Sequence, residues 1–271
     1  MKKKEIIAKL EVKHIIEKYK IRLGPYTIRE DGLIDVKSGV KIIGNKIFRL
    51  PLKFGTVTGD FNCKSIGLTT LKGSPKFIGG NFDCSDNELT TLMDGPSYVG
   101  GSYFCSENNL ISLKGCPLEI ISRFNCALNN LESLKYGPKR VGKSFYGHHN
   151  RLKTLNGAPV LVGGSFNVAG NLLNNLEGCP EYIGQNFHFD CWLASLYMTS
   201  KNCYVGGGVK IELLERIDNG DSILPEVILN NQKHLPILFS YNRYLPLYNQ
   251  LGQLETDYID DLLFEVKNGM R

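Results

Sequence analysis

Cysteine is the residue type that most invites a chemical interpretation in this sequence, because four of its copies recur at one fixed interval. They lie 21 residues apart, at Cys63, Cys84, Cys105 and Cys126. Thiols stacked about 5 Å apart on neighbouring strands could bind a soft metal or undergo redox chemistry. The same position holds Ile42, Val168 and Phe189 in other copies of the interval. A position that accepts valine or phenylalanine is a core position, and we therefore interpret the cysteines as small buried hydrophobic residues.

The adjacent pair His148-His149 is the other candidate for metal chemistry. Adjacent residues of a strand point to opposite sides of the sheet, and no acidic residue or third histidine follows at a suitable spacing. We expect both histidines to be exposed at the edge of a loop. The sequence also lacks the C-x-x-C, H-E-x-x-H, G-x-S-x-G and phosphate-binding-loop motifs. We therefore predict no catalytic residues, no metal site and no cofactor, and a protein that is not an enzyme.

The basic charge of the chain is concentrated at its N-terminus. The 271 residues carry a net charge of +5, and residues 1–22 hold eight lysines and arginines against three glutamates. The rest of the chain has equal numbers of basic and acidic residues. Since nucleic-acid-binding proteins spread basic side chains along a binding face, this distribution argues against DNA or RNA as a partner. Binding of nucleic acid through the basic N-terminal segment is an alternative that a strong salt dependence would reveal.

No segment resembles a signal peptide or a membrane span. Charged residues interrupt the apolar ones near the N-terminus, and no apolar run approaches the length that crosses a bilayer. Without a secretion signal, the eight cysteines indicate reduced thiols. We expect a cytoplasmic protein that does not bind membranes.

The elements that must position these residues are copies of one 21-residue repeat, represented by residues 82–101 (FDCSDNELTTLMDGPSYVGG). Relative to the cysteine, an aromatic residue lies two positions before, asparagine three after, leucine five and eight after, proline twelve after, and valine or isoleucine fifteen after. Alternation of aromatic and cysteine residues predicts a short strand with both side chains inward. Asparagine and proline predict bends, where the asparagine can bond to backbone groups of its own and the neighbouring coil. A period of this length predicts a solenoid with a parallel sheet.

The N-terminal segment departs from the repeat. Residues 4–20 predict a helix, because their apolar side chains fall on one side. A basic amphipathic helix could bind a membrane or a nucleic acid, but the terminal coil of a solenoid needs a cover, so we expect a cap. Residues 26–28 and 33–36 predict two short strands joined by a turn.

The C-terminal segment departs from the repeat as well. Gly206-Gly207-Gly208 predicts a linker, and the tail after it predicts helices over residues 209–217 and 257–267. The predicted domains are an N-terminal cap over residues 1–39, the solenoid over residues 40–205, and a mostly helical C-terminal cap or small domain over residues 206–271.

The repeat resembles the leucine-rich-repeat signature, written here as aromatic-x-Cys-x-x-Asn-x-Leu-x-x-Leu. Its length and proline corner are similar to those of short bacterial leucine-rich repeats. The Gly-Pro and Val-Gly-Gly turns, with residues 31–40 (DGLIDVKSGV) and 50–63 (LPLKFGTVTGDFNC), resemble repeat proteins encoded by tailed bacteriophages. The resemblance covers residues 25–190. It implies a leucine-rich-repeat solenoid with a curved parallel sheet of about eight coils. Together with the N-terminal helical cap and the mostly helical C-terminal segment predicted above, the expected fold class is α+β.

Function is expected on the outward side chains of the strand ladder, which neighbouring coils place side by side. We expect the residues immediately before and after the cysteine position, and those three before it, to face outward. Aromatic and arginine side chains at the centre of such a face are typical of protein-binding hot spots. The predicted partner-binding residues on the concave face are Phe104, Arg123, Asn125, Tyr146, His148, Asn167 and His188. One alternative places Phe104 in the core in exchange for its neighbour Tyr103.

We therefore expect a non-enzymatic protein–protein interaction module. The resemblance to phage proteins implies, in addition, a partner from the host bacterium, such as a defence protein that is bound or inhibited in the infected cytoplasm. Two alternatives stay open. One is a structural or assembly protein of a virion that uses the solenoid as a spacer, and the other is an enzyme whose activity lies in the C-terminal segment. The sequence does not specify the oligomeric state.

Overall fold

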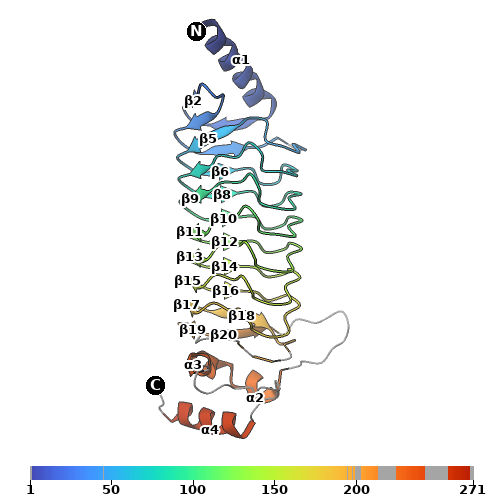
Figure 1. Ribbon diagram of the computed structural model, residues 1–271, viewed down its shortest axis with the longest axis vertical. Helices are drawn as coiled ribbons and strands as arrows, with labels where there is room; N and C mark the ends of the chain where they lie inside the picture. Colours follow the sequence, from blue (N-terminus) through green and yellow to red (C-terminus); the bar gives the residue numbers. More distant parts are fainter. Residues whose placement is uncertain are drawn as a thin grey trace. The chain divides into compact units, whose positions relative to one another are not determined.

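The computed structural model of the protein describes residues 2–44, 46–193, 195–196, 198, 203–212, 224–241 and 256–268. The chain divides into two compact units, and Figure 1 shows the strands of both as stacked coils. Residues 1–130 with 136–138 form the first unit, and residues 131–135 with 139–271 form the second. Both units are built as parallel-strand β-solenoids and hold about eight turns in total, which confirms the predicted repeat solenoid.

The first unit begins with helix α1 (Lys2–Lys18) and continues as strands in two ladders. The aromatic ladder, which carries the aromatic and cysteine positions, runs β1 (Ile21–Leu23), β4 (Val40–Ile42), β6 (Phe61–Asn62), β8 (Phe82–Asp83), β10 (Tyr103–Phe104) and β12 (Phe124–Asn125). The other ladder runs β2 (Tyr26–Ile28), β3 (Ile34–Val36), β5 (Phe54–Val57), β7 (Phe77–Ile78) and β9 (Tyr98–Val99), and β11 (Glu119–Ile120) follows along the chain. The strands from β6 to β12 of the aromatic ladder, and β7 with β9 of the other ladder, pair in parallel with residues 21 positions away.

The second unit has the same two-ladder organisation. Its aromatic ladder runs β14 (Phe145–Tyr146), β16 (Phe166–Asn167), β18 (Phe187–Asp190) and β20 (Val209–Glu212). Its other ladder runs β13 (Arg140–Val141), β15 (Leu161–Val162), β17 (Tyr182–Ile183) and β19 (Tyr204–Val205). Helical segments follow: α2 (Glu226–Leu229), η1 (Gln232–His234), α3 (Leu235–Tyr241) and α4 (Thr256–Lys267). Helix α4 confirms the helix predicted over residues 257–267.

The core of each coil consists of the positions that the repeat predicts to face inward. Phe82, Cys84 and Leu89 are fully buried, and Val99 is 1% exposed. Aromatic rings of successive coils contact each other, as the centroids of Phe82 and Tyr103 lie 4.9 Å apart. Burying a side chain of this size contributes roughly 1.5–3 kcal/mol, so repetition of the same four positions gives every coil a similar share of the core.

The asparagine that follows each cysteine position joins two coils. The Nδ2 atom of Asn108 donates hydrogen bonds to the carbonyl oxygens of Cys84 (3.0 Å), Cys105 (3.3 Å) and Ser106 (3.1 Å). Its Oδ1 atom accepts from the amide of Leu89 in the preceding coil at 3.0 Å. Asn87, Asn129 and Asn171 make equivalent bonds, whereas Asn45 lies outside the described residues. The predicted bonding of this position to its own and the neighbouring coil is confirmed.

The N-terminal end is protected by a strand. Helix α1 forms where a helix was predicted, but the apolar side chains of its first half are exposed, with Ile6 at 57% and Leu10 at 62%. Strand β1 instead covers the edge of the aromatic ladder by pairing antiparallel with β4, where Ile21 faces Ile42. The capping role of the helix therefore stays a prediction. The two strands predicted after it are confirmed as β2 and β3, an antiparallel pair.

The solenoid extends further towards the C-terminus than the sequence indicated. Residues 209–212 form β20 and pair in parallel with β18. The helix predicted over residues 209–217 is therefore wrong for residues 209–212. Residues 213–217 lie outside the described residues. Gly206, Gly207 and Gly208 form the corner between β19 and β20, as glycines do in earlier coils. They are a corner and not a linker. The three-domain division stays a prediction.

Candidate functional site

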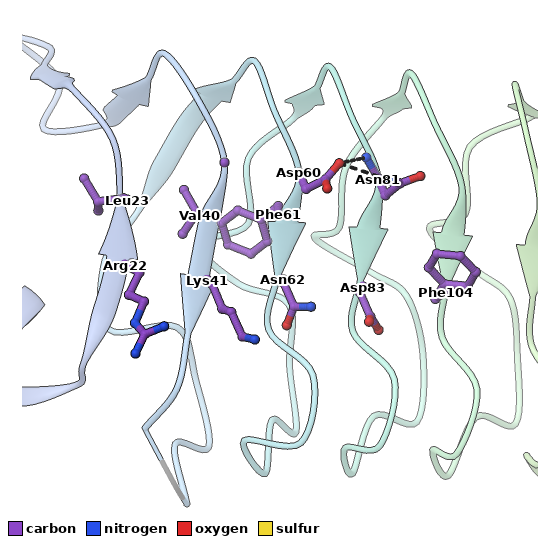
Figure 2. A pocket seen from close by; sticks show the side chains of 11 residues that line it. Arg22, Leu23, Val40, Lys41, Asp60, Phe61, Asn62, Asn81, Asp83 and Phe104 are labelled. Carbon is purple, nitrogen blue, oxygen red and sulfur yellow. Dashed lines mark hydrogen bonds between the residues drawn. The ribbon is translucent and has the colours of Figure 1, made fainter.

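The outward side chains of the aromatic ladder in the first unit form a row across five strands (Figure 2). The row consists of Arg22, Lys41, Asn62, Asp83 and Phe104, one from each of β1, β4, β6, β8 and β10. Each of these residues is the register partner of the next, which spaces them about 4.8 Å apart. A groove of about 570 Å³ lies over the row and is also lined by Leu23, Gly39, Val40, Asp60, Phe61 and Asn81. This volume suits a small molecule or a short peptide segment.

The two ends of the row differ in charge. Arg22 and Lys41 are exposed and form no ion pair with any side chain in the described ranges. The Oδ1 atom of Asp83 accepts hydrogen bonds from the amide and the hydroxyl of Ser85. The groove therefore presents two exposed cations at one end, and a carboxylate beside the half-buried ring of Phe104 at the other.

The rim of the groove is held by polar side chains three positions before the cysteine position. The Oδ1 atom of Asp60 accepts from the amide of Asn81 at 2.6 Å and from its Nδ2 atom at 3.1 Å. The Oδ1 atom of Asn81 in turn accepts from the amide of Ser102 at 2.8 Å. Each side chain thus binds the backbone of the next coil, which fixes the rim against which a ligand would lie.

In the first unit, the structure places three of the predicted partner-binding residues on or beside the outward face. Phe104 is half-buried and outward while Tyr103 is fully buried, so the alternative that exchanges them is wrong. Phe104 pairs in register with Asn125, whose Oδ1 atom accepts from the amide of Ala127 at 3.0 Å. Arg123 is exposed. Of the three, only Phe104 lines the groove.

In the second unit, the other four predicted residues lie on three successive strands and the bend after β14. Tyr146, Asn167 and His188 form an in-register row. The ring of His148 lies 6.5 Å from that of Tyr146 in an edge-on arrangement. Burial, and then the neighbouring charge of His149, lower the pKa of His148, which favours its neutral form. The Nδ1 atom of His188 lies 3.5 Å from a carboxylate oxygen of Glu212.

One part of the predicted outward face is wrong. We expected the position immediately after the cysteine position to face outward, but it is mostly buried: Ser85, Ser106, Ala127, Ala169 and Asp190 are 1–7% exposed. The chain has already turned into the bend at this point, and the following residue has a left-handed φ in several coils, such as +54° at Asp86. Only the position before the cysteine gives a continuous row.

Two features of the surface were missed. Arg22 was counted only as part of the basic N-terminal segment, because nothing in the sequence indicated that β1 would pair antiparallel with β4 and bring Arg22 beside Lys41. The second feature is a pair of exposed stacked aromatic rings in the other ladder of each unit. Phe77 and Tyr98 stack with centroids 4.8 Å apart, and Tyr182 and Tyr204 with centroids 5.1 Å apart.

The cysteines behave as core residues. Cys63, Cys84, Cys105 and Cys126 are fully buried, and burial raises the pKa of each of their thiols above its ordinary value. Reactive and metal-binding cysteines need the thiolate form, so this environment disfavours both. In the described part of the chain, no cluster of three or more His, Cys, Asp or Glu side chains could hold a metal ion.

Two carboxylates are expected to give opposite pH dependences of stability. Burial raises the pKa of Asp190 above 3.8, although the amides of Gly170 and Asn171 bond to it. Its contribution to folding is therefore fully present below pH 3.8 and is lost as pH rises through the raised pKa. The hydrogen bonds from Arg29 lower the pKa of Asp35. Its contribution is present above pH 3.8 and is lost as pH falls through the lowered pKa.

Urea unfolding of the wild type, Asp190→Asn and Asp35→Asn between about pH 3 and pH 7 measures this difference. The stability of the wild type relative to Asp190→Asn should fall as pH rises. Relative to Asp35→Asn, it should increase. The same slope for both variants would contradict the assignment.

Comparisons with known proteins add no assignment: no protein-family model, no curated protein and no solved structure matches the chain. No helix in the described ranges has the length and apolar character needed to cross a membrane.

Proposed function

We propose that this protein is a non-enzymatic binding module that holds another protein against the outward face of its aromatic ladder. The observation that carries the proposal is the in-register row from Arg22 to Phe104 beneath a groove of about 570 Å³. The row combines exposed cations, hydrogen-bonding groups and an accessible aromatic ring. Such a combination suits recognition of a polypeptide, because arginine and aromatic side chains are enriched at binding hot spots.

The resemblance of the repeat to leucine-rich repeats and to phage-encoded repeat proteins supports a finer version of the proposal. In this version, the chain is a leucine-rich-repeat protein made by a bacteriophage, and its partner is a protein of the host bacterium, for example one that takes part in defence. The protein would then act in the cytoplasm of the infected cell.

Affinity capture followed by reconstitution tests the proposal. The tagged protein is incubated with bacterial lysate, retained proteins are identified, and each is purified for measurement of its Kd by calorimetry. Phe104→Ala should weaken the reconstituted complex at least tenfold. Tyr98→Ala is the matched control, since it removes an exposed aromatic ring from the other ladder, and it should change the Kd less than twofold.

The double variant Arg123→Ala/Tyr146→Ala tests two of the predicted partner-binding residues that do not line the groove. If it binds the partner as well as the wild type does, these two residues take no part in binding. Equal affinity of the wild type and Phe104→Ala for the partner would exclude the groove as the binding site. Recovery of the chain in purified virions, with no soluble partner, would favour the structural alternative. Activity of isolated residues 206–271 would favour the enzymatic one.

A further inference from the structure

The order of charges along the groove restricts what can occupy it. Arg22 and Lys41 lie on neighbouring strands, and both are exposed without an ion-pair partner in the described ranges. At the other end, Asp83 and Phe104 are register partners. One oxygen of Asp83 is engaged by Ser85, which leaves the other oxygen for a ligand. A carboxylate next to an aromatic face is a site for a cation, because the ring adds a cation–π contact to the ion pair.

We propose that the groove binds an extended peptide segment of the partner protein that carries an acidic side chain and, four residues away, a lysine or arginine. This proposal rests on the protein-binding function proposed above and names the chemistry of the bound segment. The acidic side chain lies over Arg22 and Lys41. The basic side chain lies between Asp83 and Phe104, and the peptide runs across the strands of the ladder.

The spacing follows from the geometry of the sheet. From the midpoint of β1 and β4 to the midpoint of β8 and β10 there are three strand intervals, or about 14 Å. An extended chain advances about 3.4 Å per residue, so four residues cover this distance. Residues i and i+4 of an extended chain also point to the same side, and residue i+2 points there too, opposite the amide of Asn62.

Other occupants fit this charge order less well. A helical segment rises about 1.5 Å per residue, so its i and i+4 side chains are only about 6 Å apart. A nucleic acid would place phosphates along the whole groove, including next to Asp83 and Asp60, where like charges repel. A wholly acidic peptide meets the same repulsion. An extended segment with an acidic side chain at one position and a basic one four residues away, here called the dipolar segment, matches both ends of the groove.

A panel of synthetic peptides tests the proposal. Nine-residue Ser/Thr peptides carry one glutamate and one arginine separated by two to six positions, in both orders, and their Kd values are measured by fluorescence anisotropy at low ionic strength. Affinity should be highest for the i, i+4 peptide in one of the two orders. The i+3 and i+5 peptides should bind about fivefold more weakly, because one charged side chain then points away from the groove.

Matched variants connect the result to the groove. Asp83→Asn keeps the hydrogen bond to the amide of residue 85, as Asn62 and Asn125 do at the equivalent position, and removes only the charge. It should weaken the i, i+4 peptide about fivefold and leave a peptide with glutamate alone unchanged. Lys41→Glu should weaken both peptides. Glu88→Gln is the control, because Glu88 is an exposed acid of the same coil that does not line the groove.

The outcomes separate the two proposals. The proposal of a dipolar segment is overturned if peptide affinity does not depend on the separation of glutamate and arginine, or if it is unchanged in Asp83→Asn. If a purified partner still loses affinity on Phe104→Ala, the binding function survives that result. If neither peptide nor partner responds to changes in the groove, both proposals fail.

Discussion

Replacement of Asn108 by alanine is expected to lower the free energy of unfolding by about 3–4 kcal/mol. The side chain is 7% exposed and makes four hydrogen bonds to main-chain groups of two coils. Alanine leaves three carbonyl oxygens and one amide without this partner in a site too buried for free access of water. A buried polar group without a partner costs about 1–3 kcal/mol, and partial relaxation keeps the total below the sum of the individual costs.

The control for this variant is the next residue in the chain. Asn109 is exposed, and among the described residues only its main-chain amide bonds to the neighbouring coil, at the carbonyl of Leu89. Asn109→Ala should therefore change stability by less than about 0.5 kcal/mol. Urea denaturation followed by circular dichroism measures both. A loss of under 1 kcal/mol for Asn108→Ala would show that the bends do not depend on the asparagine.

Gly115→Ala is expected to lower the free energy of unfolding at least as much, by more than about 3 kcal/mol. Gly115 has a φ of +100°, and a Cβ atom there would meet the carbonyl of Leu92 and lie 2.6 Å from the amide nitrogen of Met93. These are main-chain atoms of the preceding coil, so they cannot move aside without disturbing its hydrogen bonds. The penalty therefore combines backbone strain with a steric clash between coils.

Gly32→Ala separates the two causes. Gly32 also has a positive φ, +80°, but a Cβ atom there would meet nothing within 4 Å. Gly32→Ala should lower the free energy of unfolding by about 1 kcal/mol, which is the cost of the left-handed conformation alone. Thermal and urea unfolding of both variants give the comparison. Failure of Gly115→Ala to fold agrees with the expectation, whereas equal losses for the two variants would mean that the coils separate easily.

The inward positions of the repeat could be predicted because each is repeated many times. Phe82, Cys84 and Leu89 have counterparts in most coils, and the apolar character of the set identifies the core without any knowledge of neighbouring strands. The asparagine role was predictable for the same reason, since one polar residue recurred where the chain had to turn. Repetition here substitutes for the tertiary information that a single strand lacks.

Repetition also decided the one coil in which residue type alone is ambiguous. The pair Tyr103-Phe104 offers two aromatic residues, and the structure buries the one with a hydroxyl, which has no hydrogen-bond partner in the described part of the chain. Gly95 leaves room for it, because a Cβ atom there would lie 3.4 Å from the hydroxyl oxygen. The repeat pattern gave the right assignment where polarity alone would have given the wrong one.

The candidate groove was predicted only at Phe104. Its cationic end depends on the antiparallel pairing of β1 with β4, a relation that no local pattern encodes. Likewise, Gly206-Gly207-Gly208 has the composition of a linker, and only its place between two paired strands shows that it is a corner. In both cases the deciding contact joins segments that are distant in the sequence.

The asparagine bonds also imply an order of events during synthesis. Asn87, Asn108, Asn129 and Asn171 each donate to the carbonyl of the cysteine position in the preceding coil, as Asn108 does to Cys84. A coil that has just left the ribosome therefore has carbonyl and amide groups that stay hydrated until the next asparagine emerges. Because nascent chains fold from the N-terminus and coils contact only their neighbours, completion of the native structure should trail translation by one repeat length.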